Sequence, residues 1–293
     1  MPADLLSTFV LILLKAADTV GRAGPYVVGG LVLAGLLSRA VHNWRWAAVP
    51  AWLPQRLFAP LAAMMGVASP LPTTGMMPLI LQWQAEGLPA RLSLTFVLAS
   101  SLLNPQLFIL TLGTLGGRFA LAQMMGVLLL STGLGLALGK ESGGWQARRD
   151  SRLFEGDRRP AGSWRQLVRL AEHVVFYFLV GVIIGASLEV LVPQSGVLGL
   201  LAERGWLSSP ALGWLAVPFY TCGGSAVPLA DSLVQIGFSP GVLFTFLLVG
   251  PALRGTTLAN LGCLLSRRAQ LTCLAILTLA GGLLGYVVDW LMM

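Results

Sequence analysis

Long apolar stretches, separated by short polar or glycine-rich segments, run along most of this 293-residue chain. A helix needs about 20 mostly apolar residues to cross a bilayer. Stretches of that length predict transmembrane helices over residues 92–115, 119–138, 170–192, 241–263 and 271–290, with a sixth over 18–38. Residues 5–14 are too few to cross, and we expect them, like the mixed charged and apolar residues 163–174, to lie along the membrane interface.

Two further apolar segments, 57–86 and 206–236, are interrupted by prolines and glycines at residues 69–75 and 218–225. Prolines and glycines at this density end a helix. Because each remaining piece is too short to cross alone, we expect each segment to form a re-entrant hairpin of two half-helices. Such a hairpin enters and leaves the membrane by the same face.

The second half of the chain repeats residues of the first half at a constant offset. Pro78, Thr95, Phe96 and Leu103 recur 150 positions later as Pro228, Thr245, Phe246 and Leu253, and Arg118 recurs as Arg268. A half-length duplication in an apolar chain is typical of transporter folds, whose substrate site lies where the halves meet. Three crossings and one hairpin per half would turn the second copy upside down, with Arg118 and Arg268 on opposite faces.

The predicted fold is therefore an all-α polytopic membrane protein built from two inverted-topology repeats. Each repeat has about three transmembrane helices and one broken re-entrant helical hairpin. We expect the first membrane repeat over residues 1–140, a cytoplasmic basic linker over 141–162, and the second membrane repeat over 163–293.

Composition and charge agree with a membrane domain. Apolar residues make up 56% of the chain and charged residues 11%, against about 25% charged in soluble domains. Much of the net charge of +7 lies between residues 140 and 169, and basic loops beside a membrane stay in the cytoplasm. We expect a multi-pass protein of the cytoplasmic (inner) membrane of a bacterium, with this loop inside and no nucleic-acid partner.

The interruptions of the two hairpins are the first candidates for chemistry. Helix starts present free N–H groups and about half a positive charge, so two starts facing each other near the midplane would favour an anion or an oxygen-rich neutral molecule. The candidate binding residues are Thr73, Thr74 and Gly75 in the first interruption, and Cys222, Gly223, Gly224 and Ser225 in the second. Thr74 and Ser225 are expected to be N-caps. The alternative is that these segments are only turns that close the hairpins.

Arg254 is the strongest single candidate for a functional residue, because it lies in the middle of the predicted helix 241–263. A charge at such a depth costs about 2.5–3.5 kcal/mol. Its counterpart in the first half is Asn104, followed by the helix-breaking Pro105. Arg254 either contacts an anionic substrate or a coupling pathway, or forms an ion pair with Asp231 that locks the helices. Both roles are compatible if the ion pair of Arg254 and Asp231 opens when a solute binds. Asp231 would then be a gating or coupling residue.

Neither the cysteines nor the methionine pairs predict a metal site. Cys222, Cys263 and Cys273 form no CxxC pair, and adjacent methionines point to different helix faces and cannot chelate a soft metal together. The sequence also contains no HExxH motif and no evident nucleophile–base set. We therefore expect no enzyme and no cofactor.

Two motifs resemble the paired signatures of the predicted-permease family, which includes the organoarsenical efflux permeases. The first is Ser69-Pro-Leu-Pro-Thr-Thr-Gly-Met-Met-Pro78, followed by Gly87 and by Ser100-Ser-Leu-Leu-Asn-Pro105. The second is Tyr220-Thr-Cys-Gly-Gly-Ser-Ala-Val-Pro228, followed by Gly237 and by Gly250-Pro-Ala-Leu-Arg254. The resemblance covers most of the chain outside the central loop and implies a permease.

Departures from the family pattern point to a different cargo. Pro72, Thr73 and Thr74 stand where the resemblance implies a Cys-Ser-Cys run, so only Cys222 remains of the thiols that would bind a trivalent arsenical. Arg254 stands where the resemblance implies a second Asn. The hypothesis is an alternating-access permease for a small, preferably anionic or oxygen-rich solute, with the site at the midplane between the repeats.

The alternatives are a non-transporting membrane scaffold or assembly partner and, less favoured, an exporter of a metalloid or soft metal. The expected partners are a small-molecule solute, the lipid bilayer and, in a homo-oligomer, further copies of the chain.

Overall fold

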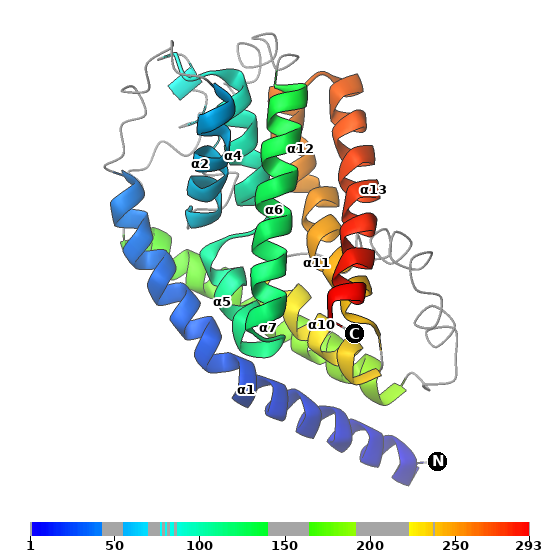
Figure 1. Ribbon diagram of the computed structural model, residues 1–293. Helices are drawn as coiled ribbons and strands as arrows, with labels where there is room; N and C mark the ends of the chain where they lie inside the picture. The colour runs from blue at the N-terminus through cyan, green and yellow to red at the C-terminus, as the bar shows by residue number, and fades with distance from the viewer. Residues whose placement is uncertain are drawn as a thin grey trace.

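The computed structural model describes residues 2–42, 55–69, 77, 80, 83–84, 87–139, 164–191, 223–236 and 238–292. Within these ranges every regular element is a helix, as the hydropathy pattern predicts. The helices are α1 (Pro2–His42), α2 (Gln55–Ala68), α4 (Ala90–Leu102), α5 (Pro105–Thr114), α6 (Gly117–Leu138), α7 (Trp164–Leu191), α10 (Gly223–Ile236), α11 (Pro240–Leu253), α12 (Gly255–Leu264) and α13 (Arg267–Met292). Figure 1 shows them as one bundle, with α1 running obliquely along its side.

Four helical stretches of the described residues are long and apolar enough to cross a membrane. They are Ala90–Thr114, Gly117–Leu138, Val174–Leu191 and Arg267–Met292, and the pair Pro240–Leu253 and Gly255–Leu264, bent by 58°, makes a fifth if it is one span. Large apolar side chains are exposed on α6, α7 and α13, among them Leu129, Phe176 and Leu283. An outward apolar surface of this kind is what lipid requires, and the five stretches match five of the predicted spans.

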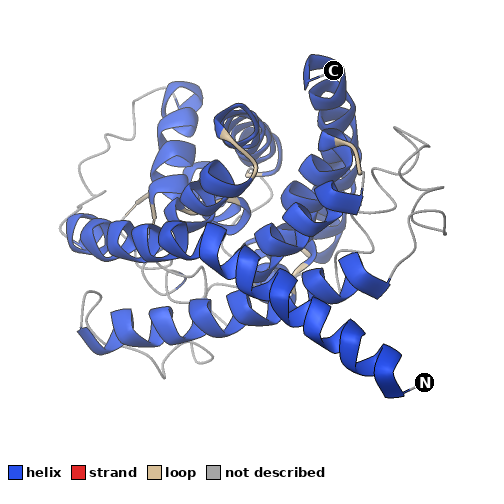
Figure 2. Cartoon of the chain, turned by 90° about the horizontal axis from the view of Figure 1, so that it is seen from below, coloured by secondary structure: helices blue, strands red, loops and turns tan. Residues whose placement is uncertain are grey.

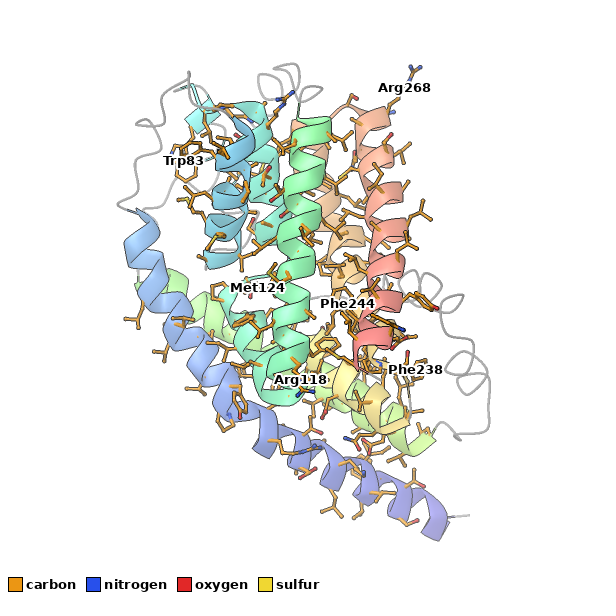
Figure 3. The ribbon with its side chains drawn as sticks, in the orientation of Figure 1. Trp83, Arg118, Met124, Phe238, Phe244 and Arg268 are labelled. Atoms are coloured by element: carbon orange, nitrogen blue, oxygen red, sulfur yellow. The ribbon has the colours of Figure 1, made fainter. Side chains whose placement is uncertain are left out.

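The offset of 150 residues seen in the sequence is also present in the helices. Helices α4, α5 and α6 begin at residues 90, 105 and 117, and α11, α12 and α13 begin at residues 240, 255 and 267. The two triplets run in opposite directions: α4 and α5 descend in Figure 1 whereas α11 and α12 ascend. Figure 3 accordingly places Arg118, at the start of α6, and Arg268, at the start of α13, at opposite ends of the bundle.

The same close helix contact occurs once in each triplet. Thr95 donates to the carbonyl of Arg91 at 2.9 Å, and Thr245 donates to the carbonyl of Gly241 at 3.0 Å. Each threonine faces a glycine of the neighbouring helix, Gly135 for Thr95 and Gly285 for Thr245, and a Cβ on either glycine would meet the threonine hydroxyl. Small residues allow membrane helices to approach this closely, so these contacts hold α4 on α6 and α11 on α13.

This contact predicts that Gly135→Ala destabilises the protein by about 1–3 kcal/mol, the usual cost of overpacking. Its Cβ would lie 3.0 Å from the backbone Cα of Thr95, which has little freedom to move. The matched control is Gly133→Ala on the same helix, since nothing lies within 4 Å of that Cβ and alanine favours the helix slightly. Thermal unfolding in detergent measures both. Equal unfolding temperatures would contradict the packing described here.

Helix α1 differs from the prediction. Residues 5–14 and 18–38 are not separate elements but parts of one helix of 41 residues, which is roughly 60 Å long at 1.5 Å per residue. Lys15, between the two stretches, pairs with Glu189 of α7, and Arg22, within the second stretch, pairs with Asp18 at 2.9 Å. Lysine and arginine are good helix formers, so these charges are compatible with one continuous helix. Figure 2 shows α1 crossing α7 over the bundle.

The second predicted interfacial segment is continuous with the span that follows it. Residues 164–174 run without a break into the predicted span as far as residue 191, and both belong to the 28-residue helix α7. Each predicted hairpin is described only in part: the first as α2, Ser69 and the helical residues 77, 80 and 83–84, and the second as α10. The predicted linker 141–162 and the interruption residues 70–76 and 218–222 lie outside the described residues.

Candidate solute-binding site

The first helix break lies at Asn104, between α4 and α5. Its backbone is extended (φ −130°, ψ 165°), and its Oδ1 accepts a hydrogen bond from the backbone N–H of Leu107 at 2.7 Å. Pro105 follows at the first position of α5, where a missing N–H costs nothing. The Asn-Pro pair therefore ends one helix and starts the next, as predicted, and Asn104 is a half-buried N-cap.

The second break lies at Arg254, between α11 and α12. Its backbone is also non-helical (φ −64°, ψ 137°), and the two arms bend by 58° around it. Unlike Asn104, Arg254 makes no side-chain cap for the helix that follows. Its Nε donates to Thr256 Oγ1 at 2.6 Å, and the side chain is half-buried. A fixed positive charge thus lies at a helix start, where the helix dipole disfavours it.

The helices that carry these breaks are in contact with one another. Helix α4 packs against both α11 and α12, the two arms around Arg254, and α10 packs against α5 and α11. Helix α11 is fixed at its far end by Asp289 of α13, which accepts from the Ser239 hydroxyl at 2.9 Å and from the Gly241 N–H at 2.5 Å. A carboxylate at a helix start is favourable, so α11 is held at one end while its other end carries the break.

Helix α10 begins at Gly223, so the predicted half-helix is present. Ser225 is buried, at 2% exposure, but is the third residue of α10, so the prediction that it is the N-cap was wrong. Gly223 and Gly224 form the first positions of the helix instead. Helix α10 packs closely on α7 at Gly181 and Gly185. A Cβ on Gly181 would meet the Ser225 backbone, and one on Gly185 would meet Ser232 Oγ.

Asp231 is buried in α10, and its ion partner among the described residues is Arg22 of α1, with Nη2 and Oδ2 3.8 Å apart. The predicted alternative in which Asp231 locks Arg254 is therefore not what the structure forms. The reason is geometric: Asp231 lies eight residues into α10, about 12 Å from its start, where α1 passes. The spacing of Lys15, Asp18 and Arg22 on one face of α1 was the signal that sequence reasoning missed.

The remaining predicted site residues, Thr73, Thr74, Gly75 and Cys222, lie outside the described residues. Within the described ranges, no group of three or more His, Cys, Asp and Glu side chains could hold a metal ion. The described part of the candidate site is thus Asn104, Arg254 and the start of α10, on helices that pack together.

Comparisons with known proteins place this arrangement in a family. A family model described as "predicted permease" matches residues 11–290. UPF0718 protein YcgR of Bacillus subtilis (strain 168) is 23% identical over 301 residues, covering 96% of this chain and 96% of that protein. No solved structure matches the chain. With its apolar helices and a family match over nearly its whole length, the chain belongs to the predicted permease family and is a multi-pass membrane protein.

Proposed function

We propose that this permease moves a small anionic or oxygen-rich solute across the cytoplasmic membrane of a bacterium by alternating access. The observation that carries the proposal is Arg254. It occupies a helix break, and its one hydrogen-bond partner among the described residues is the neutral Thr256. No carboxylate of the described residues pairs with it, so its terminal nitrogens are left to donate to oxygen atoms of a solute.

The position of Arg254 supports a binding role over a structural one. A charge inside a membrane helix costs about 2.5–3.5 kcal/mol, and a cation at a helix start is opposed by the dipole. The equivalent position in the other half holds Asn104, which caps its helix. A chain under selection for stability alone would place an uncharged cap at both breaks, and a residue that costs stability at such a site is expected to contact a solute.

Alternating access is supported by the opposed directions of the two triplets. Repeats of opposite topology give a protein two similar halves that face opposite sides of the membrane. In this proposal Thr73, Thr74, Gly75, Cys222, Gly223, Gly224 and Ser225 form the binding loops, and Asn104 and Arg254 supply side-chain contacts. Asp231, paired with Arg22 of α1, gates or couples movement of α10, and the central basic loop lies in the cytoplasm.

Flux measured in inside-out membrane vesicles tests the proposal. We expect vesicles that contain the protein to move at least one of a panel of oxyanions and sulfur-containing anions at least tenfold faster than vesicles without it. Flux of neutral solutes only would contradict the role of Arg254. Correctly folded protein that moves no solute in either direction would favour the membrane scaffold or assembly partner instead.

A further inference from the structure

Five side chains of the described part of the chain carry a buried polar atom with no hydrogen-bond partner: Ser69, Gln84, Thr111, Gln123 and Asn260. The last three lie on helices that flank the two helix breaks. Gln123 of α6 is 0% exposed and neither its Nε2 nor its Oε1 is paired; Asn260 of α12 is 1% exposed and neither its Nδ2 nor its Oδ1 is paired. Thr111 of α5 is also fully buried, with an unpaired Oγ1. Because each unsatisfied buried group costs about 1–3 kcal/mol, these groups need a partner that the described part of the protein does not supply.

The internal repeat shows that the fold does not need polarity at these positions. The residues 150 positions away from Gln123, Asn260 and Thr111 are Cys273, Leu110 and Leu261. All three counterparts are buried at 0–1% exposure in helices of the same register. An apolar side chain therefore fits each position in one half, and the amide or hydroxyl is present in the other half at a cost.

The unpaired groups lie on both sides of the two helix breaks. Asn260 is six residues beyond Arg254 along α12, a rise of about 9 Å. Thr111 is seven residues beyond Asn104 along α5, a rise of about 10 Å, and Gln123 lies on α6, which packs beside α5. Helices α5 and α12 leave their breaks in opposite directions (Figure 1), so the two sets point toward opposite faces of the bundle.

We propose that Gln123 and Asn260 mark two hydrated half-paths, one on each side of the breaks, through which water and the oxygen-bearing solute reach Asn104 and Arg254. Neutral amides both donate and accept hydrogen bonds, so they can replace part of a solute's hydration shell without holding it. Thr111 adds a hydroxyl to the half-path lined by Gln123. This inference rests on the proposed function, because a path needs a solute to carry.

Labelling of introduced cysteines with a charged, membrane-impermeant methanethiosulfonate tests the half-paths. Gln123→Cys is expected to react from one face of the membrane and Asn260→Cys from the other. One of the two variants should therefore be labelled in intact cells and the other in inside-out vesicles. Modification is counted by intact-protein mass over the background of the parent chain. The matched controls are Val127→Cys, one turn along α6, and Leu261→Cys, beside Asn260. Both are 0% exposed apolar positions and are expected to react at least tenfold more slowly.

The inference is overturned if both test positions react as slowly as the controls, or if both react from the same face. A second measurement replaces Asn260 by Leu, the residue at its counterpart. We expect Asn260→Leu to fold with at least parental stability and to lower solute flux at least tenfold; parental flux would also overturn the inference. Labelling from opposite faces in a protein that moves no solute would retain the hydrated paths and reject the transport function, so the two failures are distinguishable.

Discussion

Arg254→Asn is expected to remove transport of an anionic solute while making the protein more stable. The substitution installs the residue found at the equivalent break, where Asn104 caps α5 through the Leu107 N–H at 2.7 Å. A new N-cap on α12, which lacks a side-chain cap, is expected to add about 1 kcal/mol. Loss of the charged contact with the solute, about 1.5–3 kcal/mol, corresponds to a 10- to 150-fold weaker affinity.

The expected changes in anion affinity and in stability have opposite signs, so a loss of flux in this variant cannot be attributed to unfolding. Anion affinity and flux are measured in vesicles, and the unfolding temperature is measured in detergent on the same preparation. Arg254→Lys keeps the charge but not the planar fork of donors, so intermediate affinity is expected. Arg268→Gln removes an exposed positive charge at the end of the bundle and serves as the control. Parental anion flux in Arg254→Asn would exclude Arg254 from the site.

Gly181→Ala is expected to have the second large effect, by displacing α10. The new Cβ would lie 2.8 Å from the carbonyl carbon of Ser225 and closer still to other backbone atoms of that residue. Because backbone cannot rotate away, α10 must move as a unit, at a cost of about 1–3 kcal/mol. The start of α10 belongs to the proposed site, so solute flux is expected to fall at least tenfold together with the unfolding temperature.

Gly185→Ala, one turn along α7, is the matched control for this clash. Its Cβ would meet the side-chain oxygen of Ser232 at 2.6 Å, and the nearest backbone atom, the Pro228 carbonyl oxygen, only at 3.4 Å. The double variant Gly185→Ala with Ser232→Ala removes this oxygen and leaves the Cβ of residue 232 at 3.2 Å, a contact that a small shift relieves, so it is expected to recover most of the parental stability and flux. Ser225→Ala is not expected to rescue Gly181→Ala, since the clash there is with backbone. Equal rescue in both pairs would refute the backbone contact.

The parts of the fold that the sequence predicts well are those set by local chemistry. The apolar stretches predict the bounds of α6 and α13 to within a few residues, and the Asn104-Pro105 pair predicts the break between α4 and α5. The constant offset of 150 residues relates the helix starts of the two halves. Arg254 is identified because a charge in an apolar stretch needs a reason.

Features that depend on distant partners could not be predicted in this way. The packing of α1 on α7 includes the pair of Lys15 with Glu189, residues that lie far apart in the sequence. The same holds for Asp231, whose partner is Arg22 rather than Arg254. Gln123 and Asn260 gave no signal because α6 and α12 are apolar on most faces, so the periodicity does not say which residues are buried. Only the packed bundle shows that their amides are left unpaired.

The length of α1 has a consequence for the surrounding lipid. A 41-residue helix is about twice as long as the hydrocarbon region of a bilayer is thick, about 30 Å. An upright helix of this length would carry apolar turns into water, and α1 is not among the stretches that pass as membrane spans. A position oblique to the bilayer normal or along the membrane interface fits its length better. Since Lys15 pairs with α7 and Arg22 with α10, the lipid around α1 is in contact with a helix that is tied to the proposed binding site.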